Sequence, residues 1–360
     1  MKAIIPTGGR GTRMQPLTFS TNKHFIPVAN KPLIHYPIEA VADTGIKEVA
    51  LTYNPGWLDV VKSYLGDGSN WGLKFTYVLQ EKPLGLANVV QVCEDYLNGD
   101  SFVFHLGDNI FVDGFKDAYE SFIKGKPNGL LCVGRHPENA RMGVPYFNRQ
   151  GKLVKCVEKP NNPPNDLAII GVYFFNNDVF RCFKGRDKIK PSARGEYEIP
   201  DVYQWLIDHK YKVDVYEYKG RWLDPGKFGD WIESNQYLLD RNTNGEIKSK
   251  IDKESLVEGR VTIGKNCKIK NSKIRGPVVI GDKVVIKDSF IGPYTSISEN
   301  CFVENSRVEN SVLMAGVTIR NVLQTIDNSL IGTGTEISDV KSQHGNCLEL
   351  FVGEKSQVRL

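Results

Sequence analysis

The chain of 360 residues has no apolar run close to the roughly 20 residues that a membrane-spanning helix requires. Its N-terminus passes from MKAII straight into proline and glycine, so we expect no signal peptide. A strong excess of charge is also absent. The formal net charge is +4, which disfavours a dedicated nucleic-acid-binding protein but allows a local anion site. These absences predict a cytoplasmic protein with neither a membrane nor a nucleic-acid partner.

Paired cysteines are missing as well. The seven cysteines are odd in number, lie scattered along the chain and form no CxxC pair. Such spacing disfavours structural zinc and favours free thiols in a reducing compartment. The apolar fraction of 41% and the charged fraction of 24% are typical of a globular protein with a sizeable core.

The chain contains two kinds of sequence, as its length leads one to expect. Residues 1–242 alternate short β-rich runs, such as KAII, EVALTY and SFVFHLGD, with helical patterns, such as LIHYPIEAVADTG. This alternation predicts a three-layer α/β domain around a mostly parallel sheet, which binds ligands beyond the carboxyl ends of its strands. We expect residues 243–253 to form a linker.

Helical periodicity stops before the tail, residues 254–360. Aliphatic residues recur there every five to seven positions, with Gly, Asn, Asp and Ser between them. A near-hexad repeat of this kind predicts a parallel β-helix, in which each aliphatic side chain points into the coil. The predicted inward positions are Ile263, Ile269, Ile274, Ile280, Ile286, Ile291, Ile297, Val303, Val308, Leu313, Ile319, Ile326, Ile331 and Ile337.

The stretch PTGGRGTR, residues 6–13, follows the first predicted strand. It lacks the third glycine of the dinucleotide pattern GxGxxG, and it does not match the P-loop pattern GxxxxGK[ST]. Small residues here still allow backbone N–H groups to approach phosphate oxygens closely. Taken alone, the stretch fits equally an anion-binding loop or a tight turn with solvated arginines.

From this stretch onward, residues 6–39 resemble the opening of the sugar-1-phosphate nucleotidyltransferases, GGxGTRLxPLT followed by a lysine and PxxxKP. The likeness is strongest to the long form of the glucose-1-phosphate thymidylyltransferases, which carries a β-helix tail. It implies a Rossmann-like nucleotidyltransferase fold followed by a left-handed β-helix. Further motifs agree in order: LGLANVV (84–90), LGDNIF (106–111), VEKP (157–160), IIGVYFF (169–175), PSARGEYEIPD (191–201), RWLDPGK (221–227) and VGEKSQV (352–358).

The resemblance implies that a nucleoside triphosphate and a sugar 1-phosphate react to give a nucleotide sugar and pyrophosphate. Catalysis of this kind consists mostly of positioning and charge neutralisation. Arg13 would neutralise the leaving pyrophosphate, and Lys23 would bridge the α-phosphate and the sugar phosphate. The triphosphate would lie in a loop formed by Gly8, Gly9, Gly11 and Thr12.

Two aspartates follow short β-rich stretches, Asp108 in HLGDN and Asp224 in RWLDPG. Taken separately, each could instead cap a helix or form a turn. Mg²⁺ takes few protein ligands and prefers carboxylates together with phosphate oxygens. In the resembled family, these two positions hold the metal, so the resemblance implies Mg²⁺ on Asp108 and Asp224, with Asp108 also at the nucleotide.

The base and the sugar would be bound by other segments. Gln80, which ends FTYVLQ, would hydrogen-bond the base together with the backbone near Gly85. The resemblance implies a sugar-phosphate site, within which Tyr173 could equally be a core aromatic residue. The site would comprise Gly143, Glu158, Lys159, Tyr173 and Arg194.

Three positions depart from the family pattern. Pro6 replaces a residue before the glycines, and because proline lacks an N–H it can end the strand. His24 replaces a glutamine beside Lys23, which leaves the nucleotide preference open. Pro225 replaces a hydroxyl residue after Asp224 and stiffens that turn.

Four further interpretations stay open. The enzyme could use UTP or another sugar or cyclitol phosphate, because one methyl group changes binding by only about 1–3 kcal/mol. It could also carry an acyltransferase site in the β-helix, where His344 is the single histidine, or be a non-catalytic paralogue. We expect the tail to serve assembly into a trimer or tetramer.

Overall fold

The computed structural model describes residues 1–9 and 11–338, and the chain forms two compact units. The first unit combines residues 1–9 with 34–223, and the second combines residues 10–33 with 224–360. The second unit therefore joins an N-terminal segment to the tail. The predicted boundaries 1–242, 243–253 and 254–360 describe the order of sequence types and stay a prediction. The motif at 352–358 and His344 lie outside the described residues.

A seven-stranded sheet forms the centre of the first unit, in the order β12-β8-β11-β6-β1-β4-β5. Its neighbours are parallel except at β11, which is antiparallel to both β6 and β8. The mostly parallel sheet is the one that the alternation of strand and helix patterns predicted. Its strands are β1 (Lys2–Pro6), β4 (Glu48–Tyr53), β5 (Lys74–Leu79), β6 (Phe102–His105), β8 (Gly129–Arg135), β11 (Leu167–Phe175) and β12 (Val213–Glu217).

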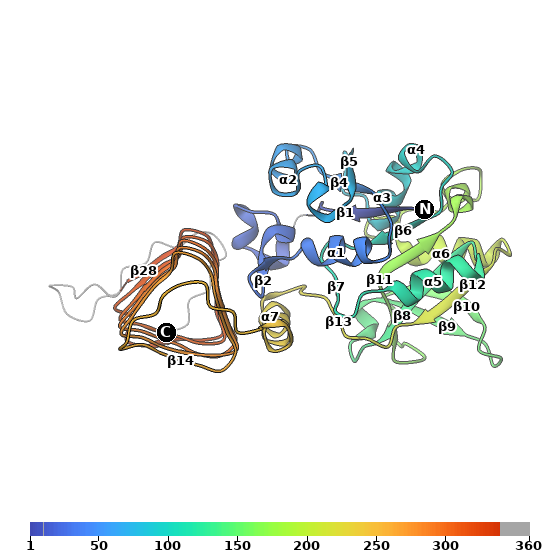
Figure 1. Ribbon diagram of the computed structural model, residues 1–360. Coiled ribbons are helices and arrows are strands. Elements are labelled where there is room, and N and C mark those ends of the chain that lie inside the picture. The colour runs from blue at the N-terminus through green and yellow to red at the C-terminus, as the bar shows by residue number, and fades with distance from the viewer. Residues whose placement is uncertain (10, 339–360) are drawn as a thin grey trace. The chain divides into compact units, whose positions relative to one another are not determined.

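Six helices and two short strand pairs complete this unit. Helices cover both faces of the sheet (Figure 1). The strand pairs are β7 (Ile110–Phe111) with β13 (Trp222–Leu223), and β9 (Gly143–Phe147) with β10 (Leu153–Glu158). The helices are α1 (His35–Asp43), α2 (Leu58–Leu65), α3 (Leu86–Val92), α4 (Glu94–Leu97), α5 (Lys116–Gly125) and α6 (Ile199–Asp208).

Burial explains why the central strands read as continuous apolar runs. Every residue of β6 is completely buried, as are Ala3, Ile4 and Ile5 of β1. A strand in the middle of a parallel sheet is covered on both faces, so it needs apolar side chains in both directions. Helix ends are marked in the sequence as well. Helix α2 ends at Gly66, whose φ of 62° favours glycine.

The described part of the tail, residues 254–338, is a left-handed parallel β-helix with three five-stranded sheets. The coil length follows from the paired residues Ile263, Ile280, Ile297, Leu313 and Ile331, which lie 17, 17, 16 and 18 positions apart. The three sheets are β14 (Leu256–Glu258), β17 (Lys273–Arg275), β20 (Phe290–Ile291), β23 (Arg307–Val308) and β26 (Thr325–Ile326); β15 (Val261–Ile263), β18 (Val278–Ile280), β21 (Thr295–Ile297), β24 (Val312–Leu313) and β27 (Leu330–Ile331); and β16 (Lys268–Lys270), β19 (Val285–Lys287), β22 (Phe302–Glu304), β25 (Thr318–Arg320) and β28 (Glu336–Ser338).

The predicted inward positions are confirmed. Twelve of the fourteen belong to the buried core of the coil, and Ile326 and Ile337 are partly buried against it. Asparagines at the corners explain the composition between them, because many of these, such as Asn271 and Asn305, have positive φ. Asparagine tolerates that conformation better than most residues. Pairing begins early, since Ile247 and Ile251 in the expected linker already form parallel bridges to Ile263 and Ile269.

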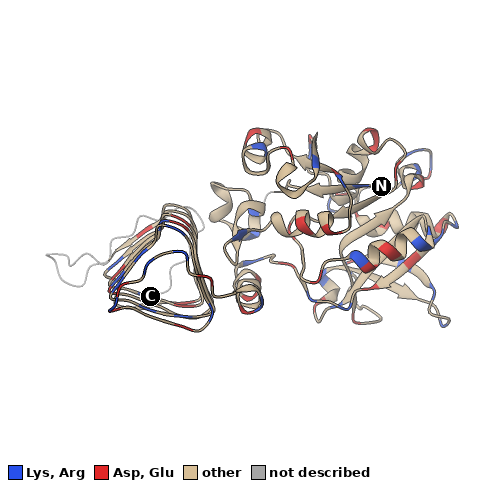
Figure 2. Cartoon of the chain, viewed as in Figure 1, with Lys and Arg blue, Asp and Glu red and all other residues tan. Residues whose placement is uncertain are grey.

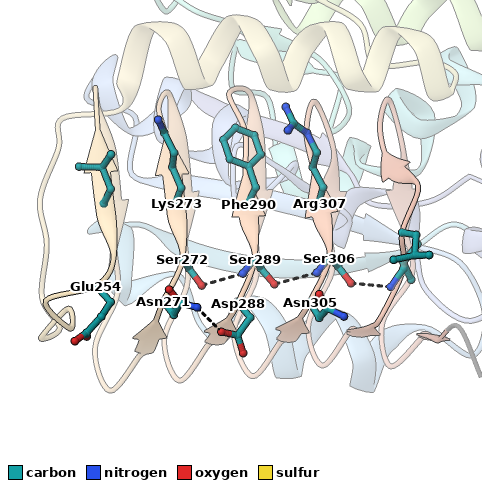
Figure 3. Close-up of a pocket in the computed structure, with 13 residues that line it drawn as sticks. Glu254, Asn271, Ser272, Lys273, Asp288, Ser289, Phe290, Asn305, Ser306 and Arg307 are labelled. Atoms are coloured by element: carbon teal, nitrogen blue, oxygen red, sulfur yellow. Dashed lines mark hydrogen bonds between the residues drawn. The ribbon is translucent and has the colours of Figure 1, made fainter.

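Serines form a hydrogen-bonded ladder along one corner of the β-helix (Figure 3). The hydroxyls of Ser272 and Ser289 accept from the backbone N–H of the serine one coil further on, each at 3.2 Å. Each hydroxyl also donates to a carbonyl two residues earlier. An open groove of about 500 Å³ lies on this face, beside Lys273, Phe290 and Arg307. The ladder satisfies backbone groups that a turn would otherwise leave unpaired.

Helix α7 (Phe228–Asn242) and the segment 10–33 complete the second unit, and α7 packs on β21. This segment contains the short hairpin of β2 (Pro27–Val28) and β3 (Lys31–Pro32). Positive and negative side chains are interspersed along the described residues (Figure 2). Among the residues that the structure describes, no helix is long and apolar enough to span a membrane.

Candidate functional site

The glycine-rich stretch begins where β1 ends at Pro6, as its missing N–H predicted. Thr7 is only 1% exposed, and both its backbone N–H and its hydroxyl donate to the carbonyl of Thr52, each at 2.8 Å. Two residues on, the N–H of Gly9 donates to Asn54 Oδ1 at 3.0 Å. Thr7 therefore fastens the start of the stretch to the end of the neighbouring strand β4.

Asn54 connects this stretch to the predicted base-binding residue. A Cβ at Gly8 would lie 2.5 Å from Asn54 Oδ1, so any other residue there would displace the Asn54 side chain. The Nδ2 of Asn54 donates to the carbonyl of Gln80 at 3.2 Å. The side chain of Gln80 in turn donates to Asn88 Oδ1 at 3.0 Å. The sequence analysis missed Asn54 and Asn88; the signal for Asn54 is a polar residue directly after a buried strand.

The predicted nucleotide loop at Gly85 contacts the segment that carries Arg194. Gly85 has φ of 100°, and a Cβ there would lie 2.6 Å from the carbonyl oxygen of Tyr197. Tyr197 donates to the carbonyl of Leu84 at 2.7 Å and accepts from Ala87 at 3.0 Å. Backbone hydrogen bonds thus join the loop at Gly85, predicted to bind the nucleotide, to the segment of Arg194, predicted to bind the sugar phosphate.

The predicted sugar-phosphate residues lie around the β9–β10 hairpin. Gly143 and Glu158 are direct partners in the antiparallel pair. Lys159 has positive φ, its backbone N–H donates to Met142, and its ammonium group lies 3.2 Å from Glu158 Oε1. The pairing sets a glycine backbone opposite a carboxylate and a cation.

Arg194 reaches the same carboxylate and two others. Its Nη2 lies 2.7 Å from Glu198 Oε1, 3.3 Å from Glu158 Oε1 and 3.7 Å from Glu196 Oε2. The hydrogen bond to Glu198 holds the pKa of Arg194 above its usual range. Burial raises the pKa of the neighbouring Asp201, and repulsion from Glu198 and Glu158 adds to the rise. Several carboxylate acceptors beside a cation suit a ligand with both hydroxyl and phosphate groups.

Tyr173 lies in the buried core of the first unit and is 5% exposed. Its ring packs on Phe104 at 5.5 Å and on Tyr203 at 6.4 Å between centroids. These contacts favour the packing role that the sequence analysis left open for this residue.

Asp108 follows β6, beside a buried amide. Asn109 is 2% exposed, and its Nδ2 donates to Asp108 Oδ1 at 3.1 Å. The indole N–H of Trp222 donates to Asn109 Oδ1 at 2.7 Å. His105, at the end of β6, is completely buried, and burial lowers its pKa to about 4. The sequence analysis assigned no role to Asn109 or Trp222.

The other predicted phosphate and metal residues belong to the second unit. Gly11, with φ of 55°, precedes the short 3₁₀ helix Thr12–Met14 that carries Arg13. The Nη1 of Arg13 lies 3.2 Å from the position a Cβ would take at Gly226, in the turn after Asp224. This unit therefore brings Arg13 next to the RWLDPGK motif.

Lys23 lies close to Gly11. A Cβ at Gly11 would be 3.5 Å from the Cβ of Lys23, which is 8% exposed. His24 is also buried, and both its backbone N–H and its ring approach Asn22 Oδ1, at 3.0 and 2.7 Å.

Within residues 1–9 and 11–338, no group of three or more His, Cys, Asp or Glu side chains is arranged to hold a metal ion. A Mg²⁺ ion bound by two carboxylates, substrate phosphates and water needs no such group. The hard carboxylate oxygens of Asp108 and Asp224 are the donor type that this ion prefers.

Comparison with known proteins gives the family. A model of the nucleotidyl transferase family matches residues 2–241. The chain is 37% identical to a glucose-1-phosphate thymidylyltransferase from Streptomyces griseus, over 100% of this chain and 99% of that one. It is 34% identical, over the full length of both chains, to a nucleotidyltransferase of low-salt glycan biosynthesis from Haloferax volcanii.

A solved structure from Bacillus anthracis agrees with these relatives. It has the provisional name glucose-1-phosphate thymidylyltransferase and was determined in complex with sucrose. It aligns with a TM-score of 0.62 at 33% identity and covers 68% of this chain and 96% of its own. The parallel sheet with its glycine-rich first loop is thus that of a nucleotidyltransferase. The chain belongs to the nucleotidyl transferase family, and its full-length relatives include glucose-1-phosphate thymidylyltransferases.

Proposed function

We propose that the protein transfers a thymidylyl group from dTTP to glucose 1-phosphate, giving dTDP-glucose and pyrophosphate. The structural observation that carries the proposal is the backbone pairing of the Gly85 loop with Tyr197, next to the Arg194 carboxylate cluster. It sets a predicted nucleotide loop beside a predicted sugar-phosphate loop. The full-length identity of 37% to a thymidylyltransferase supports the same substrates.

In the proposed reaction, an oxygen of the sugar phosphate attacks the α-phosphorus in line, and pyrophosphate leaves. Arg13 neutralises the departing pyrophosphate, and Lys23 neutralises charge that grows between the two phosphates. Gly8, Gly9, Gly11 and Thr12 bring backbone donors to the triphosphate. Asp108 and Asp224 would hold Mg²⁺, which supplies charge neutralisation of the phosphate oxygens when bound.

Gln80 favours a base with an N–H at the Watson–Crick edge. Its Nε2 donates to Asn88 Oδ1, and Asn88 is held in turn by donation to Gln91 Oε1 at 3.2 Å. This orientation leaves the amide oxygen of Gln80 to accept the N3–H that thymine and uracil carry and cytosine lacks. The contact does not distinguish dTTP from UTP, so UTP stays the alternative substrate.

The test offers purified protein each common NTP and dTTP with glucose 1-phosphate and Mg²⁺, and follows pyrophosphate release. We expect release with dTTP. No release with any pair would overturn the substrate assignment. Asp108→Asn should abolish release, whereas Asp117→Asn, on the exposed first turn of α5, should leave it intact.

Two further expectations belong to this proposal. We propose a cytoplasmic location, supported by six described cysteines that are all buried and free. We also propose a trimer or tetramer assembled through the β-helix, which light scattering on the purified chain would measure. A monomeric mass would contradict the assembly role.

A further inference from the structure

The geometry points to Asn109 and Trp222 as positioning residues that hold the carboxylate of Asp108 in one orientation. This inference rests on the proposed function, in which Asp108 is a metal ligand. All three residues belong to the first unit, and 113 positions of sequence separate Trp222 from Asn109. The two short strands β7 and β13 bring them together, with Trp222 opposite Phe111.

The chemistry of the indole fixes the orientation of the amide. An indole N–H can only donate, so the group of Asn109 that lies 2.7 Å from Trp222 Nε1 must be the oxygen. The NH₂ group then faces the other way, where it donates to Asp108 Oδ1 at 3.1 Å. With the opposite amide orientation, two donors would face each other at Trp222 and two acceptors at Asp108.

A second, independent feature makes room for this amide. Gly171, in β11, has no side chain, and a Cβ there would lie 2.2 Å from Asn109 Oδ1 and 2.6 Å from its Cγ. The carbonyl of Gly171 also accepts from Leu106 at 2.8 Å, which holds the strand close to the loop. Any larger residue at 171 would expel the Asn109 side chain from its place.

The two hydrogen bonds from Trp222 to Asn109 and from Asn109 to Asp108 form a relay. This relay restricts the Asp108 carboxylate without placing a charge beside it. A neutral donor to Oδ1 limits rotation of the Asp108 carboxylate. Less side-chain entropy is therefore lost when this carboxylate binds a cation. Aspartate at 109 would replace the donor by a second negative charge. The partners around metal ligands commonly change metal affinity about 10–100-fold when removed.

The test uses Trp222→Phe in the full chain, which keeps an aromatic ring and removes the indole N–H. Mn²⁺ replaces Mg²⁺, and electron paramagnetic resonance measures its Kd in the presence of dTTP without sugar phosphate. We expect a Kd about ten-fold higher than in the wild type. The control is Trp205→Phe, which removes an indole donor to the carbonyl of Asp187 elsewhere in the same unit and should leave the Kd unchanged.

A double variant separates the relay from a direct role of Trp222. If Trp222 acts through Asn109, adding Trp222→Phe to Asn109→Leu should raise the Mn²⁺ Kd no further. An additive rise would overturn the relay, as would a wild-type Kd in folded Trp222→Phe. Should Trp222→Phe fail to fold by circular dichroism, Gly171→Ala provides the second variant, with the same expected rise and the same contradicting outcome.

The two proposals fail in different ways. A wild type that binds Mn²⁺ with dTTP but releases no pyrophosphate would contradict the proposed function, while the Kd of Trp222→Phe would still decide the relay. A wild type that releases pyrophosphate, with an unchanged Mn²⁺ Kd in Trp222→Phe, would contradict the relay alone.

Discussion

At the scale of single residues, His105 is an unusual core side chain. Its ring packs against Phe111 and Phe115, with centroids 5.2 and 5.3 Å away. Its Nδ1 lies 2.8 Å from the carbonyl of Leu106, and its Nε2 is buried with no hydrogen-bond partner among the described residues. A protonated ring would have no solvent and no carboxylate contact at Nε2, so burial lowers the pKa to about 4.

This shift predicts a loss of stability in acid. The folded-state pKa of about 4 lies below the usual 6.5, so the folded protein favours neutral His105. The contribution is fully present above pH 6.5 and is lost as the pH falls towards 4, by at most about 3 kcal/mol. Denaturant unfolding at pH 7 and pH 5 measures it. The His105→Phe variant should lose less stability than the wild type between pH 7 and pH 5. An equal loss in both proteins would contradict the attribution of this loss to His105.

Gly85 offers a second residue-scale prediction, because its backbone lies against Tyr197. Gly85→Ala adds a Cβ 2.6 Å from the Tyr197 carbonyl, at φ of 100°. Gly99→Ala is the matched control: its φ is 88°, but nothing lies within 4 Å of the added atom. We expect Gly85→Ala to cost about 1–3 kcal/mol more in unfolding free energy and to raise KM for both substrates. If both variants changed the unfolding free energy and KM equally, the contact between residue 85 and the Tyr197 carbonyl would contribute to neither quantity.

At the scale of elements, the serine ladder stabilises the turns of the β-helix. Ser289 stands in the middle: its hydroxyl accepts from Ser306 at 3.2 Å and donates to Lys287 at 2.7 Å. Ser289→Ala leaves the Ser306 N–H without that acceptor, at an expected cost of about 1–3 kcal/mol.

Chemical denaturation of the full chain checks this prediction. Ser329→Ala is the control, because the hydroxyl of Ser329 donates to Asp327 at 2.8 Å and accepts from no N–H within the described residues. If both variants unfold at the same denaturant concentration, the ladder contributes no net stability.

The elements that the sequence predicted are those with a local signal. The strands β1, β4 and β6 each contain a short continuous apolar run, and the inward aliphatic residues of the β-helix repeat at nearly constant spacing. The pairs β7–β13 and β9–β10 were not predicted, and β7 and β13 have only two residues each, too few to show a periodicity. The pairing of β7 with β13 also depends on a partner that lies far away in the sequence.

The same reason limits what the sequence says of the candidate site. Residues with a motif, such as Arg13, Asp108 and Arg194, could be assigned roles from resemblance. Asn54 and Trp222 could not, because their roles are defined by partners 26 and 113 positions away. Folding brings these residues to the site, and no local pattern records that proximity.

At the scale of the whole molecule, a buried amide in the second unit hydrogen-bonds both the segment 10–33 and the β-helix. Asn235 of α7 is completely buried. Its Oδ1 accepts from the N–H of Ala29 and from the hydroxyl of Ser296, each at 2.9 Å, and its Nδ2 donates to the carbonyl of Tyr294 at 3.0 Å. Helix, N-terminal segment and β-helix therefore meet at this amide, and the Ser298 hydroxyl adds a hydrogen bond to Asn30 Oδ1 at 2.9 Å.

This arrangement predicts that the tail supports the triphosphate residues and does not serve assembly alone. The segment 10–33, which Asn235 holds at Ala29, carries Arg13 and Lys23. Asn235→Leu has a similar volume but leaves three polar groups without this partner, so we expect a loss of about 2 kcal/mol or more in unfolding free energy. We also expect a higher KM for dTTP, with KM for glucose 1-phosphate changed less.

The control is Asn244→Leu, since Asn244 is exposed and its Oδ1 accepts from the Thr262 hydroxyl at 3.0 Å and from the Glu246 N–H at 3.3 Å. Thermal unfolding and initial rates on both variants measure the two effects separately. Because Asn235 lies in α7 and not in the glycine-rich loop, a higher KM for dTTP would show that its contacts support triphosphate binding from a distance. A destabilised Asn235→Leu with wild-type KM for dTTP would mean that the segment keeps its geometry without the tail.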